Sequence, residues 1–456
     1  MNVSVSITIR IFLLVIYSIF IQKKFHSCLT VIRFFTNMIK NSLPKPPAEV
    51  RGMTTLDRDK FQTVAQIPCF LISVDKISDV LKILKPCLLK MPKLKPVCNE
   101  EFNKRKILLH PEKYEATLCN KVDVGLTTDD IEWTDVQLKY ENWTSDDIFR
   151  AVLPEDSVGN ISSFSIVGHI IHLNLKVELL NYKFLIGQVL LDKYQPNIKT
   201  VVNKSDVIEN TFRNFKMEHL AGEHNYQVMV KENNCKYAFD YEKVFWNPRL
   251  SSEHDRVANS IDSKDTVCDV FAGVGPFAIP LAKKGCKVCA NDLNPDSYYW
   301  LCHNAKLNKV DKRIQTYNMD GKDFIKTIVR DSIINYFNSE EENVGKFHIL
   351  MNLPAIALTF LPFFDNLLAR ESVKFSKRRT IVHCYYFRKK DENDLNVLEE
   401  YLKGDVVEKS EISVVRVVAP NKYMMRVTYE LPEGVLFFNS NSSCEPAVKR
   451  IKLLSE

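Results

Sequence analysis

The first 48 residues of this 456-residue chain contain no aspartate or glutamate, although six lysines and arginines lie there among serine, threonine and bulky apolar residues. This composition is typical of a mitochondrial presequence. The apolar run of residues 11–21 is short for the roughly 20 residues that a membrane-spanning helix needs, which makes a signal anchor the weaker alternative. We therefore expect a mitochondrial matrix protein with no membrane partner, and cytoplasmic and nuclear pools where Met38 or Met53 starts a shorter form.

Paired cysteines are also scarce. The 12 cysteines are scattered, and no second close pair accompanies Cys286 and Cys289. A zinc ribbon needs two such pairs, so we expect reduced structural thiols and no metal site. His169 and His172 are three residues apart in a predicted strand, where their side chains point to opposite faces. We interpret these histidines as packed or hydrogen-bonded residues.

The bulk composition excludes a disordered or fibrous chain, because 45% of the residues are hydrophobic and 26% are charged. A net charge of +6 is compatible with an anionic partner but does not require one. The length exceeds what one hydrophobic core usually organises. We predict a targeting segment, two smaller α/β accessory domains, a large α/β domain and a flexible tail, over residues 1–48, 49–150, 151–225, 226–435 and 436–456.

Predicted strands and helices alternate after Tyr226, starting with strands over residues 227–230, 237–240 and 266–271. Such alternation indicates a parallel sheet covered by helices on both faces, with ligands bound at the carboxyl ends of the strands. A buried strand over residues 346–350 ends in Met351-Asn352-Leu353-Pro354. A plain turn would explain this ending, but the amide of Asn352 would also lie at the ligand-binding edge.

Glycine is rare, with only 13 in the chain, yet Gly273 and Gly275 fall together after the strand of residues 266–271. The pattern G-x-G-x-x-A would suit a nicotinamide dinucleotide. However, Asp269 places a carboxylate where it can meet an ammonium group, and Pro276 removes an early helix N–H that a pyrophosphate would use. Both residues favour S-adenosylmethionine, which carries an ammonium and a sulfonium but no phosphate.

Two further aspartates follow the next predicted strands. Asp292 would accept hydrogen bonds from the ribose hydroxyls, and Asp320 would accept one from the adenine amino group. Each aspartate alone could be a helix cap or turn residue. Because Asp269, Asp292 and Asp320 lie at the ends of successive strands, we predict a binding site for S-adenosylmethionine.

Together these segments resemble the tRNA (guanine-N1)-methyltransferases of archaeal and eukaryotic type, over about residues 51–430. The matching text lies in residues 51–58, 167–170, 186–189, 200–204, 212–213, 220–223, 245–254, 271–277 and 352–354. The resemblance implies a Rossmann-like class I methyltransferase domain preceded by accessory domains, of which residues 49–150 would bind tRNA. It also implies a monomer that methylates N1 of guanosine 37, beside the anticodon, and so supports reading-frame maintenance.

The resemblance assigns roles to individual residues as well. Those that would contact the methyl donor are His254, Asp292, Leu293, Asp320, Gly321 and Asn352. Those that would handle the target base are Arg213, Glu253, Asn352 and Pro354. Phe245, where relatives often have tyrosine, departs from the pattern without touching the proposed chemistry.

The chemistry calls for such residues independently. N1 of guanine carries a proton, so a general base must remove it while negative charge gathers on O6. Glu253 is the candidate base, and Arg213 would stabilise O6 with a permanent charge. A surface salt bridge for Glu253 and a structural ion pair for Arg213 are the alternatives. Arg249, near Glu253, could instead hold a phosphate.

Three other functions stay open from the sequence. A sister family forms wybutosine intermediates by transferring the aminocarboxypropyl group of the same donor. The chain could also be a tRNA-binding protein without catalytic activity on a methyltransferase fold, or a nicotinamide-dependent enzyme.

Overall fold

The computed structural model describes residues 42–100, 103–114, 130–155, 164–208, 215–341, 344–369 and 378–437. The targeting segment up to residue 41, Arg213 and residues 438–456 of the predicted tail lie outside these ranges. The chain divides into two compact units, Met1–Ser163 with Leu175–Gln195, and Phe164–Asn174 with Pro196–Glu456. The domain boundaries expected from the sequence remain predictions.

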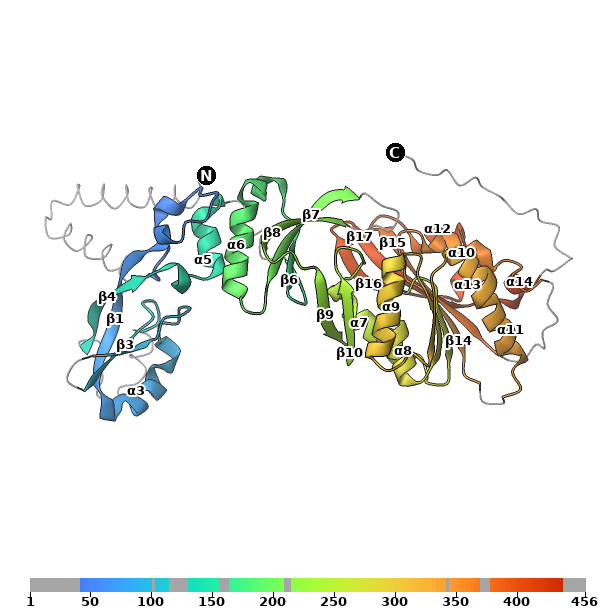
Figure 1. Ribbon diagram of the computed structural model, residues 1–456, viewed down its shortest axis with the longest axis horizontal. Helices are drawn as coiled ribbons and strands as arrows, with labels where there is room; N and C mark the ends of the chain where they lie inside the picture. Colours follow the sequence, from blue (N-terminus) through green and yellow to red (C-terminus); the bar gives the residue numbers. More distant parts are fainter. Residues whose placement is uncertain are drawn as a thin grey trace, which may run out of the picture. The chain divides into compact units, whose positions relative to one another are not determined.

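The first unit contains a four-stranded antiparallel sheet in the order β2-β3-β1-β4 (Figure 1). Phe70 of β1 and Ile107 of β3 pack with Val80 and Leu84 of the short helix α3, which buries one side of the sheet. Helices α5 and α6, which contact each other, belong to the same unit. The element bounds are β1 Thr63–Ser73, α3 Ile77–Leu84, β2 Val97–Asn99, β3 Lys104–Leu108, β4 Glu132–Leu138, α5 Ser145–Val152 and α6 Lys183–Tyr194.

The second unit begins with a four-stranded sheet in the order β5-β6-β7-β8. A tight turn at Gly168 and His169, with φ of 57° at Gly168, joins β5 to β6, so His169 lies in a turn and not in the single strand that the sequence predicted for both histidines. His169 is bonded to the Asn225 carbonyl oxygen and His172 to the Tyr241 hydroxyl, as the hydrogen-bonded interpretation predicted. The bounds are β5 Ser165–Val167, β6 Ile170–Leu173, β7 Thr200–Ile208 and β8 Phe215–Gly222.

Strands β9 (Gln227–Glu232) and β10 (Cys235–Asp240) form a separate antiparallel hairpin. The sequence interpretation placed them at the start of the parallel sheet, and that placement is wrong. Only Asn233 and Asn234 lie between the strands, both with positive φ, and two residues close a hairpin but cannot make a parallel crossover.

A seven-stranded sheet organises the rest of the second unit, in the order β13-β12-β11-β14-β15-β17-β16. The first five strands in this order, β13, β12, β11, β14 and β15, are parallel to one another. Strand β17 pairs antiparallel with β15, and β16 pairs antiparallel with β17 at the edge of the sheet. The bounds are β11 Thr266–Asp269, β12 Lys287–Asn291, β13 Ile314–Tyr317, β14 Phe347–Met351, β15 Thr380–Lys389, β16 Glu411–Ala419 and β17 Lys422–Glu430. The predicted Rossmann-like sheet is thus confirmed.

Helices cover both faces of this sheet (Figure 1). On one face, α7 (Ser251–Ser260), α8 (Ala278–Lys284) and α9 (Pro295–Leu307) bury their apolar residues with the hairpin β9-β10. The other face is covered by α10 Gly321–Phe324, α11 Arg330–Asn338, α12 Asp394–Glu399, α13 Gly404–Glu408 and α14 Glu433–Leu436. Central strand β14 is therefore buried along its whole length, which explains its continuous apolar sequence.

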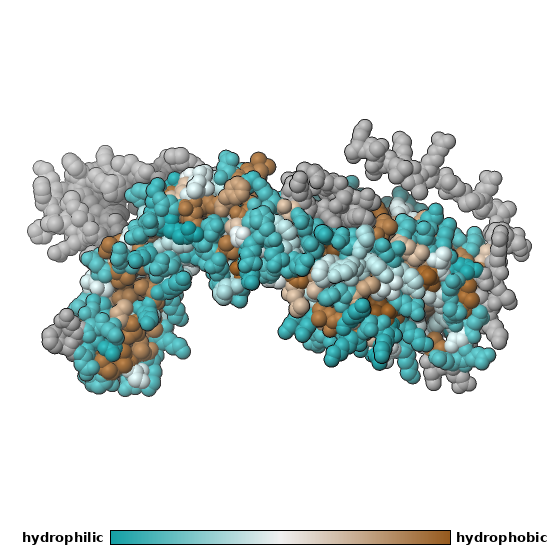
Figure 2. Space-filling view, in the orientation of Figure 1, coloured by the Kyte–Doolittle hydropathy of each residue, from teal (hydrophilic) through white to brown (hydrophobic). Residues whose placement is uncertain are grey.

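Hydrophilic residues cover much of the visible face of this unit, and apolar residues show between them in scattered patches (Figure 2). Within the described ranges, no helix combines the length and apolarity that crossing a bilayer requires.

Candidate functional site

The polar residues predicted to bind a ligand lie at one edge of the seven-stranded sheet. Asp269 is the last residue of β11, Asp292 directly follows β12, and Asn352 directly follows β14. Asp320 comes three residues after β13 and caps α10. Since β13, β12, β11 and β14 are adjacent and parallel, their carboxyl ends bring these side chains to the same edge.

Asp269 is a fully buried carboxyl group whose two oxygens have no hydrogen-bond partner among the described residues. Burial and the neighbouring charge of Asp292 together raise the pKa of Asp269 to about 8, although the Phe271 amide acts to lower it. A buried carboxylate without a partner is unfavourable. A positively charged group bound beside it would remove that cost.

Asp292, in contrast, is held by backbone amides. Its Oδ2 accepts a hydrogen bond from Gly273 N–H at 2.8 Å, and its Oδ1 accepts one from Asn294 N–H at 2.9 Å. Burial raises the pKa of Asp292 to about 6, although both amides act to lower it. The loop after β11 is thereby fastened to the end of β12.

Gly273 and Gly275 both have positive φ, 56° and 97°. A Cβ at Gly275 would lie 2.7 Å from Ile279 Cδ1 and 2.8 Å from Leu301 Cδ1, whereas a Cβ at Gly273 would meet nothing within 4 Å. Gly275 is thus required by packing inside the protein, and Gly273 has open space in front of it. The sequence analysis placed Pro276 at the start of the helix, and that placement is wrong. Pro276 lies in the loop before α8, which begins at Ala278.

Asp320, Leu293 and Gly321 lie just beyond the ends of β12 and β13, at the same edge of the sheet. Oδ1 of Asp320 accepts a hydrogen bond from Lys322 N–H at 2.8 Å, so this side chain is a helix cap that remains exposed. The Leu293 side chain is also exposed. Gly321 is buried against the rings of Phe271 and Phe360, where a Cβ would lie 2.8 and 3.0 Å from them. The two rings pack edge to face, with centroids 5.0 Å apart.

Asn352 and Pro354 form the loop after β14. The Oδ1 atom of Asn352 is buried without a hydrogen-bond partner among the described residues. The Pro354 carbonyl oxygen accepts a hydrogen bond from Phe387 N–H at 3.1 Å, which fastens the loop to β15. Asn352 therefore offers an unused acceptor from a fixed loop.

Asn291 is a residue that the sequence analysis missed. Its side chain is fully buried, donates to the carbonyl oxygens of Val270 and Met319, and accepts from Met319 N–H at 3.1 Å. It thus joins the ends of three strands. Its position directly before Asp292 was the only sign in the sequence.

Glu253, the candidate base, lies on α7 with only 10% of its side chain exposed. Oε1 accepts hydrogen bonds from the Tyr385 hydroxyl at 2.7 Å, from Arg256 at 2.7 Å and from Arg426 at 3.3 Å. Oε2 accepts one from Arg256 Nε at 2.7 Å. Tyr385 and Arg426 were not predicted, because they lie more than 130 residues later in the chain.

Beside Glu253 the surface is hollowed by a pocket of about 390 Å³. Its walls come from α7, the turn before it and strands β16 and β17, and include Arg249, Arg256, Arg426, Ser252 and Glu411. Burial lowers the pKa of the neighbouring Arg416, and the charge of Arg249 lowers it further. With three arginines in its walls, the pocket is suited to an anionic ligand.

His254, predicted to contact the donor, is buried. Its Nδ1 lies 2.5 Å from Oε1 of Glu232 on β9, and its ring packs edge to face on Phe277 at 4.7 Å between centroids. Since Glu232 is also buried, this pair fixes α7 against the hairpin. Arg213, predicted to stabilise O6, lies outside the described residues.

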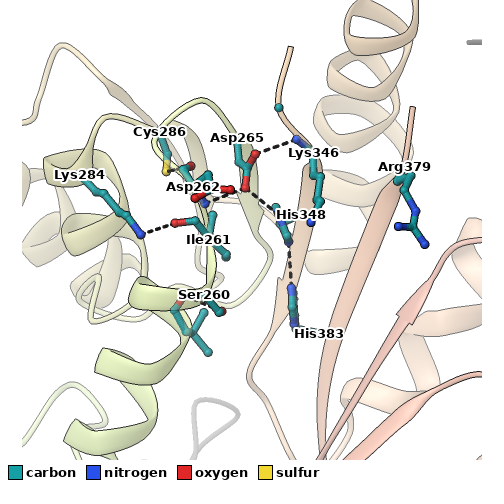
Figure 3. A network of polar contacts seen from close by, with 12 residues as sticks. Ser260, Ile261, Asp262, Asp265, Lys284, Cys286, Lys346, His348, Arg379 and His383 are labelled. Atoms are coloured by element: carbon teal, nitrogen blue, oxygen red, sulfur yellow. Dashed lines mark hydrogen bonds and ion pairs between the residues drawn. The ribbon is translucent and has the colours of Figure 1, made fainter. Parts of the chain in front are cut away.

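A second buried polar network lies at the opposite, amino-terminal edge of the sheet (Figure 3). Asp265 bonds His348 at 3.1 Å, His348 bonds His383 at 3.0 Å, and His383 bonds Thr428 at 3.2 Å. Burial alone would raise the pKa of Asp265, but hydrogen bonds from His348 and two backbone amides bring it below its usual value. This network joins the starts of β11, β14 and β15.

No group of three or more metal-ligating side chains occurs in the part of the chain that the structure describes. Cys286 and Cys289 are free thiols there. Cys286, directly before β12, donates a hydrogen bond to the Asp262 carbonyl oxygen in the loop that precedes β11, which is a structural contact.

Two family models and several known proteins are similar to this chain. The model of the TRM5/TYW2 methyltransferase domain matches residues 228–409, and that of the TYW2 N-terminal domain matches residues 145–225. A relative from Anopheles gambiae is 48% identical over 415 residues, covering 88% of this chain and 73% of the relative. One from Xenopus tropicalis is 45% identical over 423 residues, covering 90% and 84%. Both are tRNA (guanine(37)-N(1))-methyltransferases.

Two solved structures share the fold. Wild-type Trm5b from Pyrococcus abyssi is 23% identical with a TM-score of 0.53, covering 80% of this chain and 99% of that one. The complex of aTrm5 with tRNALeu contains a chain that is 24% identical with a TM-score of 0.57, covering 80% and 100%.

Proposed function

The chain belongs to the tRNA (guanine(37)-N(1))-methyltransferase family, and we propose that it transfers a methyl group from S-adenosylmethionine to N1 of guanosine 37 in tRNA. The observation that carries the proposal is the buried, unpartnered carboxyl group of Asp269 at the glycine loop. Among the groups of the donor, the α-ammonium is the one that this carboxylate would bind.

The other residues at the strand ends fit the remaining parts of the donor. Asp292, held by two amides, is ready to accept hydrogen bonds from ribose hydroxyls, and Asp320 stands at the next strand end for the adenine amino group. Gly321 and the neighbouring Phe271 ring offer an apolar surface for adenine. When bound, S-adenosylmethionine supplies a methyl group on a positively charged sulfur.

On the acceptor side, Glu253 takes the proton from N1 of guanine, which makes N1 nucleophilic. Asn352 has a free buried acceptor on the loop after β14, and Pro354 keeps that loop in place through its bond to Phe387. Arg213 is proposed to stabilise the negative charge on O6. His254 acts at a distance, by fixing the helix that carries Glu253.

The test is methyl transfer to tRNA that carries an unmodified guanosine 37, with a transcript bearing adenosine 37 as the control. Label should enter only the first transcript, as 1-methylguanosine. Methylation of both transcripts, or of neither, would refute the proposal. Calorimetric titration with S-adenosylmethionine and, separately, with NADH distinguishes a methyltransferase from a nicotinamide enzyme. A protein that binds neither ligand would be one without catalytic activity.

The match of residues 145–225 to the TYW2 N-terminal domain makes aminocarboxypropyl transfer the second candidate. Both reactions use the same donor, so donor binding cannot separate them. Mass spectrometry of the product nucleoside does so, because one methyl group adds less mass than an aminocarboxypropyl group. The curated relatives at 42–48% identity favour methyl transfer.

We also propose that the protein is a monomer, that its accessory domains hold the tRNA, and that it works in the mitochondrial matrix with cytoplasmic and nuclear pools. The acid-free composition of the first 48 residues supports the matrix location. Analytical ultracentrifugation tests the monomer. Imaging of the full chain, with and without residues 1–48, tests the location.

A further inference from the structure

We propose that Tyr385 and Arg426 are positioning residues that occupy one oxygen of Glu253 and reserve the other, Oε2, to accept the proton from guanine N1. This inference rests on the proposed function, because it assigns a direction to the base of that reaction. It concerns two residues that no motif in the sequence marked.

The two oxygens of Glu253 differ in their partners. Oε1 accepts three hydrogen bonds, from Tyr385, Arg256 and Arg426, whereas Oε2 accepts a single one from Arg256. A carboxylate oxygen has two lone-pair positions, so Oε1 is filled. Only Oε2 retains the capacity to accept a proton from a substrate.

Two of the three partners of Oε1, Tyr385 and Arg426, are buried in the sheet and held in place. Tyr385 is fully buried in β15, and its ring packs at 5.9 Å from that of Phe277. Arg426, in the neighbouring strand β17, is 3% exposed and is also held by Glu411 at 3.0 Å. A hydroxyl and a guanidinium fixed by two sheet strands therefore determine the rotation of the carboxylate.

The partner of Oε2 is replaceable. The Arg256 side chain is 42% exposed and comes from the same helix as Glu253, three residues later. Because the Arg256 guanidinium is partly in contact with solvent, its bond to Oε2 can give way to a substrate base while Tyr385 and Arg426 still hold Oε1. The pocket rich in arginine adjoins this carboxylate, so a substrate base can approach from it.

The N1–H bond of guanine breaks, its proton forms an O–H bond at Oε2 of Glu253, and N1 keeps the electron pair. This pair forms the N1–CH3 bond as the S–CH3 bond of the donor breaks, and the donor sulfur keeps the electrons of that bond and leaves as a neutral thioether. Tyr385 and Arg426 take no proton. They keep Oε2 turned towards the pocket, and misplacement of a base by about 1 Å can cost roughly a hundredfold in rate.

The first test compares two neighbouring tyrosines on opposite faces of β15. Tyr385→Phe removes the hydroxyl that bonds Glu253, while Tyr386→Phe removes one that bonds Asp394 at 2.6 Å, away from the site. The single-turnover rate of methyl transfer should fall roughly tenfold to a hundredfold in Tyr385→Phe, because a hydrogen bond to a charged group is lost. The Kd values for S-adenosylmethionine and tRNA should stay within about twofold, and Tyr386→Phe should keep the wild-type rate.

The second test compares the two arginines. Arg426→Lys should lower the single-turnover rate with unchanged Kd values, because a lysine cannot reach both Glu253 and Glu411. Arg256→Ala should lower it by no more than about threefold, because Tyr385 and Arg426 still hold Oε1 when the partly exposed Arg256 side chain is removed. Larger loss in Arg256→Ala than in Tyr385→Phe, or a Tyr385→Phe rate within twofold of wild type, would overturn the inference. If the wild-type protein transfers no methyl group at all, the proposed function itself fails.

Discussion

Oδ2 of Asp292 accepts a hydrogen bond from Gly273 N–H at 2.8 Å, which joins the end of β12 to the glycine loop that follows β11. Asp269, in the neighbouring strand, has no such partner among the described residues. The two carboxyl groups therefore differ in their hydrogen-bond partners. Backbone amides stabilise the carboxylate of Asp292, while the oxygens of Asp269 remain available to a positively charged ligand.

Asp269→Asn should make the ligand-free protein more stable and abolish donor binding. Asp269 has its pKa raised to about 8 when folded, against roughly 3.9 when unfolded. The folded chain thus binds the proton more tightly, and the stability that this contributes is lost as the pH rises from about 4 through 8. Urea unfolding at pH 8 should show a gain of at least about 1 kcal/mol in Asp269→Asn.

Asp292→Asn is the matched control for that measurement. An asparagine has only one acceptor oxygen for the two amides, so its NH2 group would face an N–H donor and the protein should lose stability. Equal stability changes in the two variants, or retained binding of S-adenosylmethionine by Asp269→Asn, would contradict the ammonium site.

Glu253→Gln should lower the single-turnover rate of methyl transfer by roughly 10² or more, because a carboxamide cannot take the N1 proton. The Kd for S-adenosylmethionine should not change. Glu408→Gln is the control, because Glu408 is an exposed glutamate at the end of α13 and does not contact Glu253 or its described partners. Rapid-quench measurement of both variants checks the assignment, and equal rates in the two would count against Glu253 as the base.

Gly275→Ala should destabilise the protein far more than Gly273→Ala. Both positions have positive φ, which costs an alanine roughly 1–2 kcal/mol. At Gly275 the new Cβ would also lie 2.7 Å from Ile279, so the loss there should reach roughly 3 kcal/mol or more. Thermal unfolding of the two variants tests this, and similar losses would show that α8 can shift to accept the methyl group.

Stability should fall as the pH drops from about 7 towards 4, and His383 should contribute to that fall. Burial, with the charges of His348 and Arg256, lowers the pKa of His383 to about 3, while the unfolded chain has a value near 6.5. Between these values the unfolded state binds a proton that the folded state does not, so acidification favours unfolding.

The measurement is urea unfolding of wild type, His383→Gln and the exposed-site control His303→Gln at several pH values between 7 and 4.5. The stability difference between His383→Gln and wild type should shrink as the pH falls. A difference that stays constant would show that His383 does not carry this pH dependence, and His303→Gln should follow the wild-type curve.

Some parts of the fold could be predicted because their cause is local. The strand of residues 266–271, its glycine turn and the buried run before Asn352 carry their periodicity and turn residues in consecutive positions. The hairpin β9-β10 was misplaced for a similarly local reason, since the two asparagines between its strands were overlooked as a turn.

By itself the sequence determined which chemical groups are available, namely aspartates at strand ends, the amide of Asn352 and the carboxylate of Glu253, and it placed the chain in a family. Only the tertiary structure decided their state. Burial leaves Asp269 without a partner, and strand pairing across the sheet brings Tyr385 and Arg426 to one oxygen of Glu253. Hydrogen bonds and desolvation depend on neighbours in space, and residues more than 130 positions apart become neighbours only when the sheet forms.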